Sequence, residues 1–185
     1  MTPPSPLQWF EQFGVDDAVL RKVLSEATAR GADDADLFFE HSVSTAIGLS
    51  DRVVNRAHTS VDLGVGVRVV VGDQVGYAYS EDLSLESLIR AAQTARTIAH
   101  DRAVATPVPV TLHRPSPNFY PVSRQWSDVA LDTRVPMLRR WEAEAFARDP
   151  RIQKVRVSMG DSDTHVLVAR ADGTVVADIG APPQD

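Results

Sequence analysis

The amino-acid sequence predicts an α+β fold, with a largely antiparallel sheet, made of a meander and C-terminal hairpin strands, and about three helices. Apolar residues recur at helical spacing in some segments and alternate with polar residues in others, which is the pattern of a strand with one buried face. The predicted order is helix, four strands, two helices and three strands. Runs of strands followed by runs of helices are typical of α+β folds.

The first predicted elements are a helix and two strands. Residues 1–15 form a loose, proline-containing lead-in, and a helix is expected over about residues 16–30, with acids at its start and Gly31 just past its end. Apolar and polar residues then alternate over residues 35–43, which predicts a half-buried strand. A second strand follows a turn and passes through Val53.

A glycine-rich segment follows, with the sequence VDLGVGVRVVVGDQVGYAYSEDLS. A dinucleotide-binding turn needs the spacing G-x-G-x-x-G between a strand and a helix, so that backbone amides and the helix N-terminus meet the pyrophosphate. Here Gly64 and Gly66 are followed by Val69 at the third glycine position, and the β-branched residues continue. The segment therefore predicts two strands joined by a turn at residues 72–74, which complete the meander.

Two further helices are expected after the meander. The first covers about residues 85–99, with an apolar stripe on one face and Ser84 as its N-cap. Residues 101–125 are rich in proline, which removes backbone donors, and are expected to form a long irregular connection. The next helix is expected to start near Pro136, and Ser127 is an alternative cap for an earlier turn.

The end of the chain predicts three more strands. Residues 154–160 and 164–178 are rich in β-branched residues, and an Asp-Gly dipeptide at residues 172–173 is a strong signal for a hairpin turn. We therefore expect one domain over residues 16–179, followed by a short tail at residues 180–185.

Composition excludes several classes of protein. The 25 acidic and 19 basic residues give a net charge of -6, which opposes binding to nucleic acid or to anionic lipid. The chain has no cysteine, so it forms no disulfide and needs no oxidising compartment. No secretory signal and no apolar run long enough to span a membrane is present. A cytoplasmic location without membrane or nucleic-acid partners is the simplest expectation.

No catalytic motif is complete in the sequence. The five histidines are scattered, without the pair one helical turn apart that zinc peptidases commonly use. A nucleophile elbow at Gly48 and Ser50 lacks its last glycine, since Arg52 occupies that position. The acidic clusters lie at element boundaries, where carboxylates cap helices and start turns. We therefore expect no catalytic residue and no metal ligand in this chain.

Several segments together resemble a known family. ADLFFE at residues 35–40, DRVVNRAHTSVDLGVGVRVVVGDQVGYAYSEDLSLESLIRAAQTARTIAHD at residues 51–101 and LVARADGTVVAD at residues 167–178 are similar, in order and spacing, to the N-terminal domain of the TldD branch of the TldD/PmbA metallopeptidases. The resemblance runs from about Gly31 to Asp178. It carries over no catalytic or metal-binding residue.

The resemblance implies a function for the family and a limit for this chain. Members are cytoplasmic metallopeptidases that act on unfolded or short peptides, usually as a pair of homologous subunits. Their metal motif, a histidine-glutamate sequence with a second histidine nearby, lies in a following domain, and this chain ends at Asp185, about where that domain would begin. We therefore expect this chain alone to be inactive and truncated, with zinc bound only by the missing catalytic domain.

We expect the chain to help form a substrate cleft or a subunit contact. The edge of an antiparallel sheet can receive an extended peptide through backbone hydrogen bonds, and Arg68, Tyr77 and Tyr79 are the candidates for that substrate or partner surface. The expected partner is a TldD/PmbA-type catalytic chain or a homologous subunit. The alternative is a free-standing, non-catalytic interaction or regulatory module.

Overall fold

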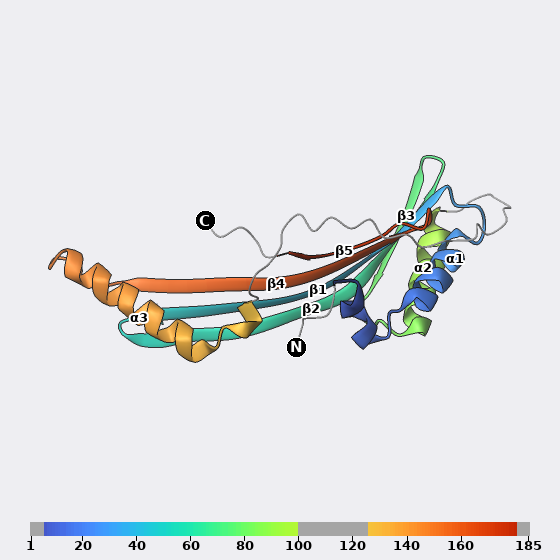
Figure 1. Cartoon of the computed structure of the whole chain (residues 1–185). Helices are drawn as coiled ribbons and strands as arrows, with labels where there is room; N and C mark the ends of the chain where they lie inside the picture. Colours follow the sequence, from blue (N-terminus) through green and yellow to red (C-terminus); the bar gives the residue numbers. More distant parts are fainter. Residues whose placement is uncertain (1–5, 100–125, 181–185) are drawn as a thin grey trace. The chain divides into compact units, whose positions relative to one another are not determined.

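The computed structural model describes residues 6–99 and 126–180, and it has the α+β fold that the sequence predicts. Five strands form one antiparallel sheet in the order β3-β2-β1-β4-β5 (Figure 1). The elements are, in chain order, the 3-10 helix η1 (Pro6–Phe13), α1 (Asp17–Thr28), β1 (Asp34–Ser50), β2 (Val53–Val71), β3 (Gln74–Ser80), α2 (Leu85–Ala99), the 3-10 helix η2 (Trp126–Asp128), α3 (Leu131–Arg148), β4 (Arg156–Arg170) and β5 (Val175–Gly180).

The chain divides into two compact units. Unit 1 consists of Met1–His41, Leu63–Tyr120 and His165–Ile179, and unit 2 of Ser42–Asp62, Pro121–Thr164 and Gly180–Asp185. Residues 16–179, for which the sequence predicts one domain, contribute to both units. The predicted proline-rich connection at residues 101–125 lies outside the described residues, as do residues 181–185 of the predicted tail.

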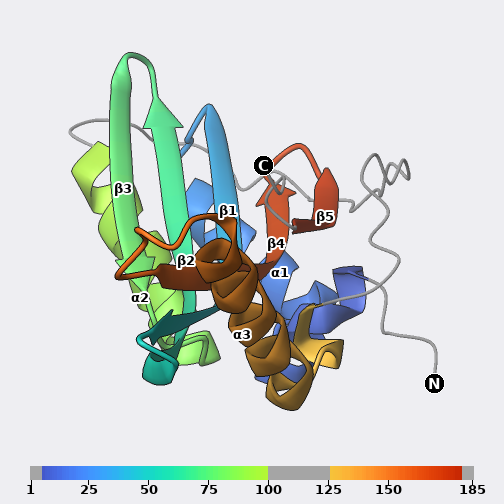
Figure 2. The ribbon, with the colours of Figure 1, turned by 90° about the vertical axis from the view of Figure 1, so that its left-hand side faces the viewer.

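In unit 1, α1 and α2 pack on one face of the sheet (Figure 2). Every second residue of the strands faces them, and these residues are fully buried in β1 (Ala35, Leu37 and Phe39) and in β2 (Val67 and Val69). The alternation predicted for residues 35–43 therefore reflects a sheet with one covered face.

α1 begins one residue after its predicted start, with Asp16 as its N-cap, and α2 begins just after its predicted cap, Ser84. Asp16 accepts a hydrogen bond from the backbone N–H of Val19 at 2.8 Å, and the Ser84 hydroxyl accepts one from the N–H of Ser87 at 3.4 Å. α1 ends at Thr28, slightly earlier than predicted. Gly31 follows with a φ of 80°, a left-handed conformation that glycine adopts without strain.

The prediction of a loose lead-in is wrong for residues 6–15. Pro6–Phe13 form a 3-10 helix, and Phe10 and Val15 are 0% and 2% exposed. Proline fixes φ near the helical value, so a proline-containing segment can also begin a helix. Burial of the Phe10 side chain contributes about 1.5–3 kcal/mol, enough to anchor this short element to the core.

The 3-10 helix η1 also places Trp9 against two histidines of unit 1. The indole ring stacks on the ring of His165, with centroids 3.6 Å apart and planes 2° apart. The indole Nε1 donates a hydrogen bond to Nδ1 of His41 at 3.3 Å, so His41 must be neutral at that nitrogen. Burial lowers the pKa of His41 below its ordinary value of 6.5.

Stability should therefore depend on pH through His41. Because the folded pKa is depressed, the unfolded chain binds more protons, and the free energy of unfolding should fall as the pH drops below 6.5 and through the folded pKa. The His41→Asn variant keeps an acceptor for Trp9 but does not titrate. Denaturant unfolding between about pH 5 and pH 8 should show a weaker pH dependence for this variant than for the wild type. Identical pH profiles would contradict the prediction.

Two strands of the structure each take the place of two predicted strands. β2 is continuous over 19 residues and β4 over 15, where the sequence predicts two strands in each region, so the sheet has five strands and not seven. Residues 55–62 of β2 are all exposed. Without a buried face these residues show no alternation, and hydrogen bonding along the backbone extends the strand without a signal in the side chains.

In unit 2, α3 packs on the sheet through one apolar residue and two charged ones. Leu138 is fully buried against Ile47 and Leu49. Arg134 and Glu142 lie one turn away on either side of Leu138, and they are only 5% and 2% exposed. The inward stripe of α3 is therefore largely polar, which hides it from a search for apolar periodicity.

The prediction that the third helix starts near Pro136 is wrong. α3 begins at Leu131 and contains Pro136 in its interior. The alternative turn near Ser127 corresponds to η2, three residues before α3. Because Pro136 is only the sixth residue of α3, its missing N–H removes one hydrogen bond near the start of the helix. The first turn of α3 is held by Arg134, which contacts Asp161 and the backbone oxygen of Trp126.

Glu142 connects α3 to the turn between β1 and β2. The turn residues Asp51 and Arg52 both have left-handed φ values, of 53° and 66°, as a two-residue hairpin of type I′ requires. The carboxylate of Glu142 accepts a hydrogen bond from the backbone N–H of Arg52 at 2.9 Å. This bond gives a hydrogen-bond partner both to the buried carboxylate of Glu142 and to a backbone amide of the turn.

Candidate functional site

The structure brings the three candidate surface residues together on two neighbouring strands of unit 1. In the antiparallel register of β2 and β3, Arg68 lies opposite Tyr77, and Gly66 lies opposite Tyr79. The side chains of Tyr77 and Tyr79 are exposed, at 58% and 74%. The two tyrosines therefore lie on the face of the sheet opposite to the helices.

The other face of β3 is closed by α2. A Cβ atom built at Gly76 would lie 1.8 Å from the backbone oxygen of Ala95 and 2.8 Å from the nitrogen of Ala99. Only a glycine permits this approach between strand and helix. Among the residues that the structure describes, β3 is therefore covered on one face only, and its edge and its other face carry no neighbouring strand or helix.

Arg68 is held by carboxylates of β1. Its Nε donates a hydrogen bond to Oδ2 of Asp36 at 2.6 Å, and its guanidinium also forms an ion pair with Asp34 at 3.5 Å. The hydrogen bond to Asp36 raises the pKa of Arg68. Arg170 of β4 joins the same group through Asp34 at 3.0 Å. Arg68 thus links β2 to β1, and its charge is compensated within the protein.

Tyr77 lies across the backbone of β2. A Cβ atom at Gly66 would come within 2.5 Å of the Tyr77 hydroxyl and 3.1 Å of its ring, so the absence of a side chain at Gly66 makes room for the tyrosine. The second glycine of the glycine-rich segment therefore positions an exposed aromatic ring.

The register also shows which backbone groups of β3 point away from the sheet. Gly72 has a φ of 56°, and Val71 pairs with Gln74 across a two-residue loop, so these two flanking residues form a hydrogen-bonded pair. Hydrogen-bonded and non-hydrogen-bonded pairs alternate along an antiparallel ladder. Val75, Tyr77 and Tyr79 are then in non-hydrogen-bonded pairs, with their N–H and C=O groups directed outward.

We call Val75, Tyr77 and Tyr79 the β3 edge. β3 is the last strand of the described sheet on that side, and all three residues have exposed side chains. Val75, at 56% exposed, was not among the sequence candidates. Its position two residues before Tyr77, on the same face of a strand, is the signal that could have identified it.

The described residues contain no metal centre of the usual kind. Within residues 6–99 and 126–180, no group of three or more His, Asp or Glu side chains is close enough to hold a metal ion. None of the helices in that part of the chain combines the length and the apolar character required to cross a bilayer.

Comparison with known sequences identifies one family. Residues 35–99 match the family model described as PmbA/TldA metallopeptidase domain 1. The chain is 30% identical over 152 residues to the metalloprotease TldD homolog of Haemophilus influenzae, covering 81% of this chain and 31% of the relative. It is 27% identical over 165 residues to the metalloprotease TldD homolog of Buchnera aphidicola, covering 89% and 34%. The chain spans about a third of the length of these curated relatives.

Two solved structures share the fold. A putative modulator of DNA gyrase from Bacteroides thetaiotaomicron has a TM-score of 0.66 at 17% identity, covering 89% of this chain and 38% of that one. TldE from Thermococcus kodakarensis has a TM-score of 0.66 at 16% identity, covering 88% and 36%. At these identities the likeness concerns the fold alone.

Proposed function

We propose that this chain binds an extended peptide as an additional strand along the β3 edge. The chain belongs to the TldD/PmbA family of metallopeptidases and corresponds to the N-terminal domain of that family. The observation that supports this proposal is the outward direction of three backbone positions on a terminal strand whose side chains are also exposed. Backbone hydrogen bonds suit unfolded substrates, because they do not depend on the substrate's side chains.

The peptide-cleaving chemistry is proposed to come from elsewhere. A catalytic domain or a homologous subunit of the same family would supply the metal ligands, and this chain would contribute to the substrate cleft or to the contact between subunits. Tyr77 and Tyr79 would cover the added strand on the open face of the sheet, where aromatic and β-branched neighbours stabilise cross-strand pairs.

The Tyr77→Pro variant tests the proposal. Proline removes an outward N–H while leaving the bonds between β2 and β3 intact, and edge strands tolerate it. We expect the affinity for an unstructured, fluorescein-labelled peptide to fall by at least about tenfold, because a hydrogen bond is lost and the proline ring obstructs the incoming strand. Fluorescence anisotropy measures the change.

The matched control is Tyr77→Ala, which removes the aromatic ring but keeps the backbone N–H. It should lose less affinity than Tyr77→Pro, and circular dichroism should show that both variants keep the fold. If the two variants bind the peptide equally well, the backbone edge is not the binding element and the proposal fails.

A further inference from the structure

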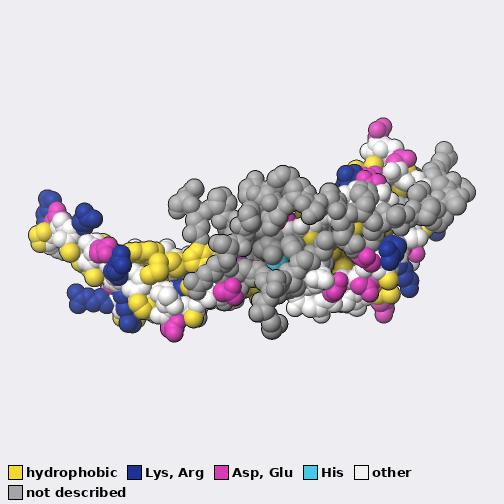
Figure 3. Space-filling view, viewed as in Figure 1, with side chains coloured by type: hydrophobic (Ala, Val, Ile, Leu, Met, Phe, Trp, Pro, Cys, Tyr) yellow, Lys and Arg dark blue, Asp and Glu magenta, His cyan; other side chains and the backbone are white. Residues whose placement is uncertain are grey.

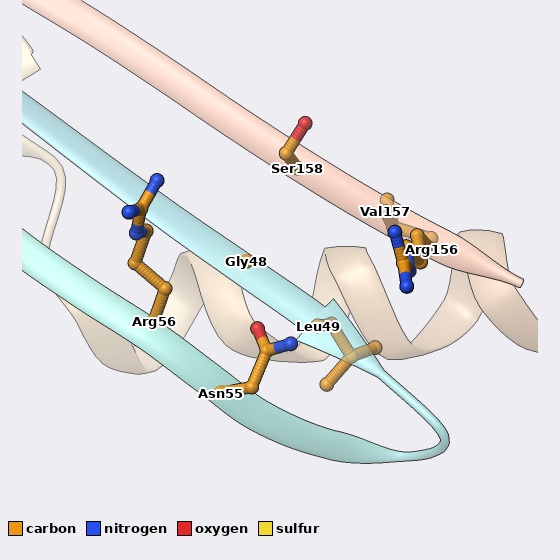
Figure 4. Close-up of a pocket in the computed structure, with 7 residues that line it drawn as sticks. All are labelled: Gly48, Leu49, Asn55, Arg56, Arg156, Val157 and Ser158. Carbon is orange, nitrogen blue, oxygen red and sulfur yellow. The ribbon is translucent and has the colours of Figure 1, made fainter.

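A hollow in unit 2 crosses three strands of the sheet. It has a volume of about 350 Å³ and is lined by residues of β1, β2 and β4 (Figure 4); these are Gly48, Leu49, Asn55, Arg56, Arg156, Val157 and Ser158. We call it the three-strand hollow. It lies in a different unit from the β3 edge, and it is not lined by Arg68, Tyr77 or Tyr79, the candidates named from the sequence.

Gly48 creates the space at the centre of the three-strand hollow. β1 lies between β2 and β4 in the sheet, so the absence of a side chain at Gly48 leaves a depression between β2 and β4. A Cβ atom at this position would lie 3.1 Å from Oδ1 of Asn55 and 3.5 Å from Cβ of Arg56. Even one methyl group would therefore press on the side chains that line the hollow.

The lining of the three-strand hollow is positively charged. Arg56 reaches from β2 across β1, and Arg156 lies at the start of β4 (Figure 4). An amide and a hydroxyl, from Asn55 and Ser158, complete the polar lining, and none of the described residues that line it carries a carboxylate. At the end of unit 2 where the turn between β1 and β2 lies, Lys and Arg side chains alternate with Asp and Glu side chains (Figure 3), and one of them, Lys154, pairs with Asp51.

These two arginines differ from the structural arginines of the chain. Arg68 and Arg134 each form ion pairs with carboxylates of neighbouring strands. Among the residues that the structure describes, neither Arg56 nor Arg156 forms an ion pair or a hydrogen bond through its guanidinium. No other described side chain uses the donors of these two guanidinium groups.

We propose that the three-strand hollow binds a carboxylate group of a bound peptide, either its C-terminal carboxylate or an Asp or Glu side chain. Guanidinium groups present paired donors that match the geometry of a carboxylate. The net charge of -6 acts against polyanions such as nucleic acid but not against a single carboxylate in a locally positive hollow. This inference rests on the proposed peptide-binding function and specifies which peptides bind best.

The test uses the full chain and a set of matched peptides. An acetylated glycine-serine peptide is prepared with a free C-terminal carboxylate, as its C-terminal amide, and as an amide with one internal Asp. The two carboxylate-bearing peptides distinguish the two sources of the anion. NMR signals of the Nε–H groups of Arg56 and Arg156 report binding at the hollow, and titration gives the affinity.

We expect at least one carboxylate-bearing peptide to bind at least about tenfold more tightly than the neutral amide, and to shift the signals of Arg56 and Arg156. Arg56→Gln and Arg156→Gln should each remove that preference. Arg139→Gln, at an exposed arginine of α3, should leave it unchanged. Ser158→Glu should abolish the preference by supplying a carboxylate within the hollow.

Three outcomes would overturn the inference. The first is equal affinity for all three peptides in the wild type. The second is an unchanged preference in Arg56→Gln and Arg156→Gln. The third is inorganic phosphate competing as effectively as the carboxylate peptides, which would indicate an unspecific anion site. If all peptides bind equally but Tyr77→Pro weakens them, only this inference fails. If no peptide binds the wild type, the proposed function fails as well.

Discussion

Replacing Gly76 with alanine is expected to lower the free energy of unfolding by more than about 3 kcal/mol, beyond the usual cost of overpacking a core. The added methyl group would lie 1.8 Å from the backbone oxygen of Ala95. The clash is with the backbone of α2 and not with a flexible side chain, so the whole helix must move away from β3. Urea or thermal unfolding measures the loss.

Two other glycines provide graded controls for this substitution. A Cβ atom at Gly72 would meet nothing within 4 Å, but Gly72 has a φ of 56°, so Gly72→Ala should cost about 1 kcal/mol through backbone strain. At Gly160 the nearest atom would be 3.8 Å away, an ordinary contact, and Gly160→Ala should be close to neutral. A Gly76→Ala variant as stable as Gly72→Ala would show that α2 does not lie on β3 as described.

The same contact explains the small residues on the inner face of α2. Ala91, Ala92, Ala95 and Ala99 are buried. Small side chains on the helix and a glycine on the strand bring the two backbones together, and larger residues at these positions would push them apart. Ala95 and Ala99, which belong to the apolar stripe predicted from the sequence, lie where α2 comes closest to Gly76.

The parts of the fold that the sequence predicts are those in which side chains alternate between a core and solvent. The residues around Leu37 and Val67 show this pattern, and the bounds of α1 and α2 follow from caps such as Asp16. The exposed stretch of β2 has no buried face, and α3 buries Arg134 and Glu142 where a helix normally buries apolar residues. In both regions the structure is determined by backbone pairing or by specific polar partners, which periodicity does not reveal.

The candidate surface could be predicted only in part for a similar reason. Tyr77 and Tyr79 lie two residues apart in a predicted strand, and this spacing makes them candidates from the sequence alone. Which backbone groups point outward depends on the register with β2 and on the place of β3 at the end of the sheet. The partner of Arg68 likewise depends on the pairing of distant strands, which places Asp36 of β1 beside it.

Replacing Arg134 with alanine should destabilise unit 2 by about 3–5 kcal/mol, the usual cost of removing one partner of a buried ion pair. Arg134 donates to Oδ2 of Asp161 at 2.5 Å and to the backbone oxygen of Trp126 at 2.5 Å, and it also lies over the Trp126 ring. The two charged side chains are only 6% and 7% exposed. Without Arg134, the Asp161 carboxylate would be buried without its counter-charge.

The pH dependence of this variant distinguishes the electrostatic cost from a simple loss of packing. Burial raises the pKa of Asp161, with Asp163 adding to the effect and Arg134 opposing it. When a carboxyl group has a higher pKa in the folded than in the unfolded protein, the free energy of unfolding falls as the pH rises. For Asp161 this fall begins near the unfolded pKa of 3.8 and continues through the folded pKa. Removing Arg134 should raise that pKa further, so Arg134→Ala should regain part of its lost stability toward acidic pH. A constant loss at every pH would indicate lost packing instead.

Two comparisons complete the test of this ion pair. Arg140→Ala breaks the exposed pair with Glu144 on the same helix, and it should change the free energy of unfolding by less than about 1 kcal/mol. The double variant Arg134→Met with Asp161→Leu replaces both charges by apolar groups and should recover most of the stability that Arg134→Ala loses. If the double variant is as unstable as Arg134→Ala, the bond to the Trp126 carbonyl, and not the buried charge, holds the start of α3.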